Sequence, residues 1–389
     1  MSSVTRRHRS LRRALVAGLA AVVLTGCQVN APRLGSAPAG GGGTVDVAML
    51  LPLSSQQGGD AIIARSMENA ARMAAAEQGG MTINLRVYNT DGSSATAASV
   101  AQQAAQDGAD VILGPLRSEA AAAVGVAVAN SGLSVLSFSN NTEIAGGNVF
   151  VLGSTFANTA DRIVSHAAQN GAGTLVLVHA ANLAGEVARD AVSSAARRSG
   201  TRVAAAIPYE FSQTGVINAV PRVVEAVRDT GATGVLLTAD SAGALPFFAQ
   251  LLPENGLDTT QVRLMGLTRW DTPPQTLDFS GLQGGWFALP DPGAASAFEA
   301  RYAANYGAPP HPLAALAYDG VRLIANTAAT QGGLRPNDLV ASGGISGAAG
   351  ALQLLPDGTI RRALAIAQVT DNQVAIIDPA PRRSGGPGL

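Results

Sequence analysis

Ala109-Asp110-Val111-Ile112-Leu113-Gly114-Pro115-Leu116-Arg117-Ser118-Glu119 is the stretch that decides the fold. Its apolar run stops at the Gly-Pro pair, and an alanine-rich segment follows over residues 119–129, a pattern that predicts a buried strand, a tight loop and a helix. The first N–H groups of such a helix lack partners within the helix and carry the positive end of its dipole, so they suit a carboxylate. Two interpretations of Ser118 stay open: it binds such an anion, or it caps its own helix and contributes about 1 kcal/mol.

The same alternation of apolar runs and alanine-rich segments extends over most of the chain. Strands are expected at residues 45–51, 82–88, 111–113, 134–138, 175–178, 203–207, 234–237, 262–266, 351–355 and 363–369. Helices are expected at residues 60–77, 95–107, 119–130, 157–170, 185–199, 216–230, 241–252, 294–306 and 313–329. This alternation predicts an α/β fold with parallel sheets covered by helices on both faces, in which ligands bind beyond the carboxyl ends of the strands.

The N-terminal region has the features of an export signal. Residues 1–13 are basic, and residues 14–24 form an apolar stretch too short to span a bilayer comfortably. Leu24-Thr25-Gly26-Cys27 resembles the lipobox of bacterial lipoproteins, which implies a signal peptide over residues 1–26 and lipidation of Cys27; a free thiol or an intermolecular disulfide is the alternative. Because Gln28 follows, the resemblance implies an outer-membrane anchor facing the periplasm. Residues 27–43 are expected to form a flexible linker, and residues 379–389 a disordered tail.

Composition narrows the classes of function. A chain of 389 residues with 47% hydrophobic and 14% charged residues can bury a large core, and we expect two lobes. Without the five arginines of the signal, 26 − 5 = 21 basic residues face 27 acidic ones, a formal charge of −6 that argues against a nucleic-acid partner. The chain has no lysine, which excludes a phosphate-loop or Schiff-base lysine. The chain has a single cysteine and no pair of histidines at metal-ligand spacing, so we expect no metal. We also expect no cofactor and no enzymatic activity.

A series of motifs resembles the leucine/isoleucine/valine-binding family of type I periplasmic binding proteins. The motifs are residues 47–54 (VAMLLPLS), Gly59 with the helix after it, 88–91 (YNTD), 108–115 (GADVILGP), 306–307 (YG) and 314–321. The resemblance implies a two-lobed α/β fold with three crossovers and a ligand cleft between the lobes. It places lobe 1 at about residues 44–153 and 293–355 and lobe 2 at about 154–292 and 356–378. The crossovers are then expected near residues 153–156, 290–292 and 355–358.

The resemblance also assigns candidate cleft residues. In lobe 1, Ser118 with Arg117 beside it is expected to meet a ligand carboxylate, and the loop over residues 137–142 offers further polar groups from Ser139, Asn140, Asn141 and Thr142. In lobe 2, the aromatic and acidic residues that are typical of the family are replaced.

Two lobe 2 residues remain candidates. Asp240 could pair with a ligand ammonium, whose burial without a counter-charge would cost several kcal/mol, or it caps the helix that follows. Trp270 is expected near the cleft mouth, where it would stack on a ligand or partner.

Two functions fit this resemblance. Residues 267–273, 284–292 and 344–347 resemble lipoproteins of this fold that are classed as penicillin-binding-protein activators, which implies a non-catalytic regulator in contact with a peptidoglycan synthase. The alternative is capture of an amino-acid-like small molecule for an ABC permease. In either case the protein would contact the membrane through its N-terminal lipid.

Overall fold

The computed structural model describes residues 43–382, so the predicted signal peptide, Cys27 and nearly all of the predicted linker lie outside the described residues. The first lobe contains a five-stranded parallel sheet in the order β2-β1-β3-β4-β5. Its strands are β1 (Thr44–Leu51), β2 (Thr82–Asn89), β3 (Val111–Leu113), β4 (Val135–Ser137) and β5 (Val149–Val151).

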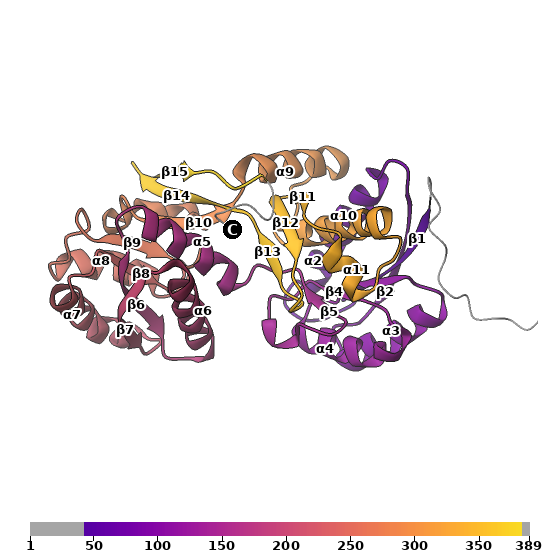
Figure 1. Ribbon diagram of the computed structural model, residues 1–389, viewed down its shortest axis with the longest axis horizontal. Helices are drawn as coiled ribbons and strands as arrows, with labels where there is room; N and C mark the ends of the chain where they lie inside the picture. Colours follow the sequence, from indigo (N-terminus) through magenta and orange to yellow (C-terminus); the bar gives the residue numbers. More distant parts are fainter. Residues whose placement is uncertain (1–42, 383–389) are drawn as a thin grey trace, which may run out of the picture. The chain divides into compact units, whose positions relative to one another are not determined.

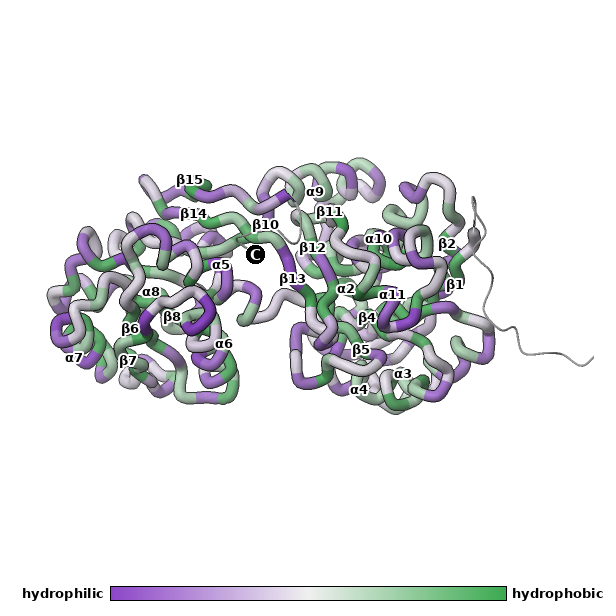
Figure 2. The backbone as a smooth tube through the Cα atoms, in the orientation of Figure 1, coloured by the Kyte–Doolittle hydropathy of each residue, from purple (hydrophilic) through white to green (hydrophobic). Residues whose placement is uncertain are grey.

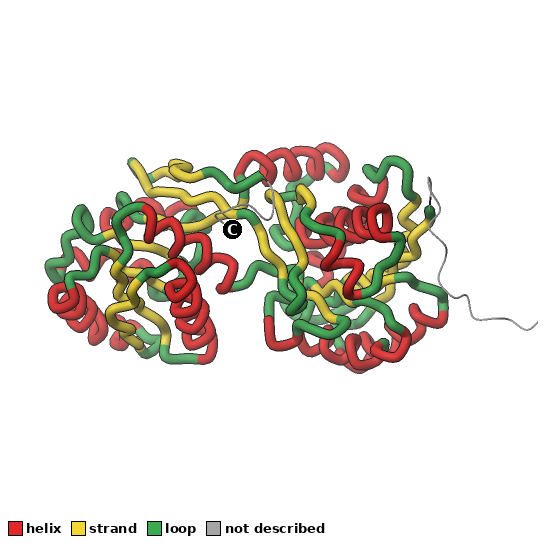
Figure 3. The backbone as a smooth tube through the Cα atoms, in the orientation of Figure 1, coloured by secondary structure: helices red, strands yellow, loops and turns green. Residues whose placement is uncertain are grey.

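Helices cover both faces of this sheet (Figures 1 and 3). α2 (Asp60–Ala76) and α10 (Ala314–Gln331) pack together over one face, and α9 (Pro292–Tyr306) adds aromatic side chains to the same core. α3 (Ser94–Gln106) and α4 (Ser118–Ala127) cover the other face. The shorter helices are η1 (Ala129–Ser131), η2 (Thr142–Ile144) and α11 (Pro336–Ala341).

The second lobe contains a seven-stranded sheet in the order β15-β14-β10-β9-β8-β6-β7, in which β14 and β15 run antiparallel to their neighbours. Its strands are β6 (Thr174–Ala180), β7 (Arg202–Tyr209), β8 (Gly234–Leu237), β9 (Arg263–Gly266), β10 (Trp286–Pro290), β14 (Leu364–Thr370) and β15 (Gln373–Asp378). One face packs on α5 (Phe156–Gln169) and α6 (Leu183–Ser199), the other on α7 (Gln213–Thr230) and α8 (Leu245–Glu254). Two short helices, η3 (Pro274–Asp278) and η4 (Ser280–Leu282), precede β10.

A third, three-stranded sheet joins the two lobes along the chain. It consists of β11 (Ile345–Gly347), β12 (Gly350–Leu354) and β13 (Ile360–Arg362), and the chain enters the seven-stranded sheet at Leu364. The sequence places this passage near residues 355–358, but Pro356-Asp357-Gly358 instead forms the turn between β12 and β13.

The α/β class predicted from the sequence is confirmed. Hydrophobic stretches, green in Figure 2, run along strands of both large sheets, as expected for strands that helices cover on two faces. No helix among residues 43–382 has the length and apolar character needed to cross a membrane.

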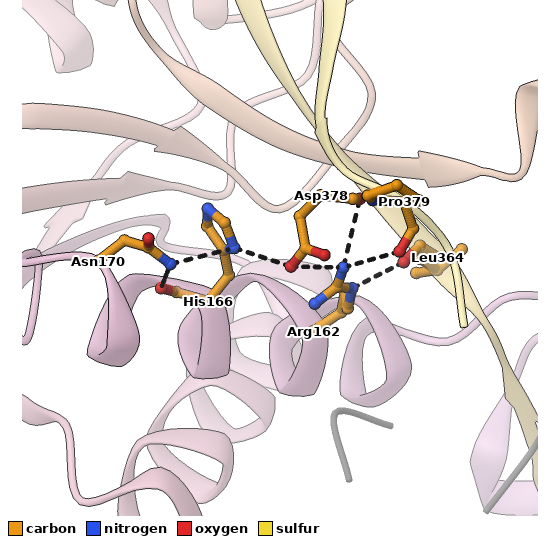
Figure 4. Close-up of polar contacts among 6 residues, drawn as sticks. All are labelled: Arg162, His166, Asn170, Leu364, Asp378 and Pro379. Carbon is orange, nitrogen blue, oxygen red and sulfur yellow. Dashed lines mark hydrogen bonds and ion pairs between the residues drawn. The ribbon is translucent and has the colours of Figure 1, made fainter. Parts of the chain in front are cut away.

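Two side chains of α5 fasten the C-terminal strand β15 (Figure 4). The Arg162 guanidinium forms an ion pair with Asp378 at 2.8 Å and donates from Nε to the carbonyl of Leu364 at 2.7 Å. His166 lies one turn further along, and its Nδ1 donates to the same Asp378 carboxylate at 3.1 Å, because an ionised carboxylate only accepts. The other ring nitrogen of His166, Nε2, is buried with no partner in residues 43–382, and the ring meets Trp286 edge-on at 4.9 Å.

We expect the free energy of unfolding to decrease as the pH falls below about 6.5, in part because of His166. Burial lowers the pKa of His166 below its ordinary value of 6.5, and the opposing effect of Asp378 is smaller. The unfolded chain therefore binds the proton first, so this contribution is full above pH 6.5 and is lost at lower pH, at up to about 1.4 kcal/mol per pH unit for one proton.

Urea denaturation of the wild type and of His166→Asn between neutral and acidic pH measures this effect. The asparagine amide retains a donor near Asp378 but does not titrate, so the variant should lose part of the acid sensitivity. His311, whose pKa burial also lowers, contributes acid sensitivity of the same sign in both proteins. Equal pH dependence in both proteins would contradict the role of His166.

Candidate functional site

A hollow of about 710 Å³, which we call the first-lobe pocket, opens beyond the carboxyl ends of the first sheet. The strand ends meet there because the five strands are parallel. The lining comes from the segments that follow β1, β3, β4 and β5 and from the start of α10: Gly58, Asp60, Ile63, Leu116, Arg117, Ser118, Glu119, Phe138, Ser139, Asn140, Asn141, Gly153, Ser154, Pro312, Leu313 and Leu316.

The structure brings five of the eight predicted cleft residues together in this pocket, namely Arg117, Ser118, Ser139, Asn140 and Asn141. The other three lie elsewhere. Thr142 is exposed at the start of η2 and is not part of the lining, while Asp240 and Trp270 belong to the second lobe.

The start of α4 presents unpaired backbone donors to the pocket. Arg117 occupies the N-cap position without a side-chain cap, and Ser118 is the first helical residue, so the interpretation of Ser118 as a helix cap is wrong. The N–H groups of Ser118, Glu119 and Ala120 donate to no protein acceptor within residues 43–382. Such donors, together with the dipole of a ten-residue helix, favour an anion at this point.

Gly114 allows the loop before α4 to approach β1 closely. Its φ is +103°, and a Cβ at this position would lie 2.4 Å from the carbonyl oxygen of Leu50. Both the backbone conformation and the contact therefore require glycine, which explains why the loop turns at this residue.

Arg117 is already paired on one side. Its Nη2 lies 2.7 Å from Oδ1 of Asp60 and its Nε 3.2 Å from Oδ2, while Ser55 Oγ donates to Oδ2 at 3.1 Å. Asp60 is 2% exposed, whereas the Arg117 side chain is 44% exposed. The buried acid therefore orients the guanidinium at the pocket wall and leaves part of it accessible.

Sequence reasoning missed Asp60 as a pocket residue. The available signal was its place after Gly58-Gly59, at the first position of a helix that follows the carboxyl end of β1. An acid in the first turn of a helix is common for dipole reasons alone, so this signal does not reveal the partner across the pocket.

The loop after β4 is held in place by its own hydrogen bonds. The N–H of Asn141 donates to Oγ of Ser139 at 3.0 Å, and the N–H of Gly153 donates to the carbonyl of Ser139 at 3.0 Å. Asn140 is exposed, and its amide has no protein partner in the described part of the chain. The loop thus offers one free amide from a fixed backbone.

Asp240, the second-lobe candidate for an ammonium partner, forms no ion pair or side-chain hydrogen bond within residues 43–382. Asp240 is exposed, and it does not cap the following helix as the alternative interpretation expects, because residues 241–244 form turns and α8 begins at Leu245 with Ala244 as N-cap. Burial, together with the negative charge of Asp240, raises the pKa of Tyr209 to about 12. Arg269 donates two hydrogen bonds to Asp271, which is therefore already paired.

Trp270 does not lie at a cleft mouth, and that expectation is wrong. The side chain is 0% exposed and belongs to the core of the second lobe, with its ring centroid 5.8 Å from that of Phe287. Glycines at 266 and 285 make room for the indole, since a Cβ on Gly266 would lie 2.2 Å from Nε1. In a sequence, an aromatic residue after a strand end fits a core position as well as it fits a ligand contact.

No group of three or more histidine, cysteine, aspartate or glutamate side chains suited to a metal ion occurs within residues 43–382. In the same range, the histidines have structural contacts: His179 lies 3% exposed at the end of β6, and Nδ1 of His311 accepts a hydrogen bond from the N–H of Leu313 at 3.2 Å.

The fold is similar to that of solved transport-associated binding proteins. A putative branched-chain amino acid ABC transporter protein from Rhodospirillum rubrum has a TM-score of 0.72 at 18% identity, covering 86% of this chain and 100% of that one. A solute-binding protein from Rhodopseudomonas palustris BisB5, in complex with 3,4-dihydroxybenzoic acid, has a TM-score of 0.57 at 19% identity, covering 89% and 99%. A substrate-binding protein from Desulfitobacterium hafniense in complex with Leu has a TM-score of 0.60 at 18% identity, covering 86% and 100%. At these identities the similarity establishes the fold alone.

None of the curated proteins matches this chain in sequence. The family model of the periplasmic binding proteins, however, matches residues 44–373, a range that includes all strands of the first sheet and all but the last strand of the second. Members of this family are substrate-binding proteins, and a periplasmic location is typical of them. With two lobes of the expected topology and a polar pocket at the strand ends, the chain belongs to the periplasmic binding protein family.

Proposed function

We propose that the protein captures a small carboxylate solute in the first-lobe pocket, as the binding component of an ABC importer. The observation that carries the proposal is the start of α4, where three unpaired N–H groups and the Ser118 hydroxyl lie beside the partly accessible Arg117 guanidinium. These groups are all donors, so they suit the oxygens of a carboxylate. The ligands named for the solved structures, Leu and 3,4-dihydroxybenzoic acid, share a carboxyl group.

Two free acids allow the bound carboxylate to carry an ammonium group. Asp60 is 2% exposed and is occupied by Arg117 and Ser55, and Asp271 is occupied by Arg269. Glu119, in the lining of the first-lobe pocket, and Asp240, in the second lobe, are exposed and make no ion pair within residues 43–382. Amino acids therefore stand beside hydroxy, oxo and aromatic acids as ligands for the test.

We expect Ser118→Ala to weaken binding of such an acid about tenfold, which corresponds to about 1.4 kcal/mol for a lost hydrogen bond to a charged group. Calorimetry with leucine, its 2-oxo acid analogue and 4-hydroxybenzoate compares ligands with and without an ammonium group. Ser280→Ala is the matched control, because Ser280 is an exposed serine of the second lobe without a side-chain partner in residues 43–382. Absence of binding by every carboxylate, or equal affinities of the Ser118 variant and wild type, would contradict the proposal.

A regulatory role is the second candidate, favoured by apolar side chains at the surface of the second lobe. Leu183, which follows β6, is 76% exposed, and Phe211, which follows β7, is 64% exposed. Large exposed apolar side chains of this kind suit contact with another protein. We infer from the motif resemblance that this protein would be a peptidoglycan synthase. A pull-down with purified penicillin-binding proteins tests the role, and Phe211→Ala should weaken any specific capture.

We also infer lipidation of Cys27 and an outer-membrane anchor from the lipobox-like sequence. Mass spectrometry of the mature protein tests the first inference, since diacylation adds lipid mass to a new N-terminal cysteine, and Cys27→Ser abolishes it. Membrane fractionation tests the second, with inner-membrane recovery as the contradicting result.

A further inference from the structure

A second hollow, of about 330 Å³, lies between the start of α5 and the turn that joins β12 to β13; we call it the crossover pocket. Four of its lining residues are arginines, two from the helices of the second lobe and two from β13, where Figure 2 shows a purple, hydrophilic stretch. The full lining is Thr155, Ala157, Asn158, Asp161, Arg162, Arg198, Leu355, Asp357, Thr359, Ile360, Arg361 and Arg362.

Two of the four arginines are committed to the fold. Arg162 is paired with Asp378 and with backbone carbonyls, as Figure 4 shows. Arg362 is paired with Asp319 at 2.6 Å and donates to the carbonyl of Leu152. The main partners of Arg162 and Arg362 lie outside the crossover pocket. These two arginines are therefore part of its wall and are not free to bind a ligand.

The other two arginines have donors to spare. Arg361 is partly buried and makes no ion pair or side-chain hydrogen bond within residues 43–382. Arg198 pairs with Asp161 through Nε and Nη2, but its side chain remains 57% exposed. The remaining acid of the lining, Asp357, accepts from the N–H and hydroxyl of Thr359 and forms no ion pair with Arg361. Arg361 therefore lines the crossover pocket as a partly buried residue whose guanidinium has no counter-ion within residues 43–382.

We propose that the crossover pocket binds a small phosphate-type oxoanion, held by Arg361 and Arg198. The planar guanidinium presents parallel N–H donors that match two oxygens of a phosphate, and partial burial strengthens the attraction relative to bulk water. The volume exceeds the roughly 30 Å³ of one water many times, so the pocket admits a phosphate ion and has room for a small organic group attached to it.

An anion bound in the crossover pocket would connect segments of the chain that are far apart in sequence. Arg198 belongs to α6 and Arg361 to β13, so one bound anion would bridge a helix of the second lobe and the small sheet that precedes β14. The same segments already meet through Asn158, whose amide donates to the carbonyl of Arg362 at 2.9 Å and accepts from its N–H at 2.6 Å. A bound anion therefore stabilises the junction between α5, α6 and β13.

Titration with inorganic phosphate at constant ionic strength, balanced with chloride, tests the proposal by calorimetry and thermal shift. We expect saturable binding to the wild type, a loss of at least about tenfold in affinity for Arg361→Gln, and an intermediate loss for Arg361→Lys, which keeps the charge but not the planar fork. Arg65→Gln is the matched control, because Arg65 is an exposed arginine of α2 without a partner in residues 43–382 and far from the lining in sequence.

Two outcomes would overturn the proposal: no saturable heat with phosphate, or equal phosphate affinities for Arg361→Gln and the wild type. If Arg361→Gln lowers the Tm in the absence of phosphate, the phosphate affinities of Arg361→Lys and Arg198→Gln are compared with that of the wild type instead. The test does not involve the first-lobe pocket, so its result is independent of the carboxylate experiment.

Discussion

Replacing Arg362 by methionine should lower the free energy of unfolding by about 3–5 kcal/mol, because it leaves a buried carboxylate without its counter-charge. The partner is Asp319 in α10, which is 0% exposed and lies 2.6 Å from Nη1 of Arg362, itself 10% exposed. The N–H of Ala348 also donates to Asp319 at 2.6 Å, but one neutral donor cannot offset a full buried charge. Urea denaturation, followed by circular dichroism, measures the loss.

Arg301→Met is the matched control for this prediction. Arg301 also pairs with an acid, Glu77, but the two side chains are 47% and 32% exposed, so the loss should stay within about 1 kcal/mol. The double variant Asp319→Asn with Arg362→Met should recover part of the stability, since it removes the buried charge. Equal losses for the Arg362 and Arg301 variants would show that Asp319 does not depend on its ion pair.

The Asp319–Arg362 pair has a structural role that reaches beyond its own stability. Asp319 is enclosed between α10, β13 and the segment before β12. Its partner stands at the last residue of β13, directly before the chain enters the second sheet. The pair therefore fixes the first lobe's α10 to the strand that leads into the second lobe.

The fold could be predicted from the sequence where each strand is apolar and lies between two others. β1, β3 and β8 are buried on both faces, so hydrophobicity alone locates them. Four of the strands that the sequence did not predict, β5, β11, β13 and β15, lie at sheet edges. The fifth, β10, is the exception, because it is apolar and lies between β9 and β14. β15 is an edge strand with exposed isoleucines at 376 and 377, and its pairing with β14 depends on tertiary contacts such as those of Asp378.

The candidate site could be predicted only as far as strand order determines it. Ser118 and Asn140 follow neighbouring parallel strands, and the ends of such strands meet at one edge of the sheet, so their shared pocket follows from topology. The Arg117–Asp60 pair does not follow, because it depends on the side-chain directions of two separate helices. The same limit applies to Trp270, whose surroundings are decided by glycines that come from β9 and the segment before β10.

Trp270→Ala should also lower the free energy of unfolding, by about 3–5 kcal/mol, because it empties a large volume in the core of the second lobe. The indole is fully buried and packs against Phe287 and the two glycines at 266 and 285, whose backbones cannot collapse into the space. Affinity of the folded protein for a carboxylate should not change, since Trp270 does not line the first-lobe pocket. Urea denaturation measures the first effect, and calorimetry at low temperature, where the variant stays folded, measures the second.

Trp270→Phe separates packing from hydrogen bonding at the same position. Nε1 of Trp270 is buried without an acceptor in residues 43–382, so phenylalanine removes an unsatisfied donor while it keeps most of the ring. We therefore expect a smaller loss than for alanine, because the residual cavity is smaller and no polar group is orphaned. The prediction would be contradicted if Trp270→Ala kept the stability of the wild type and lost affinity for the carboxylate. In that case the indole would have to leave the core and contact the ligand in the state that binds.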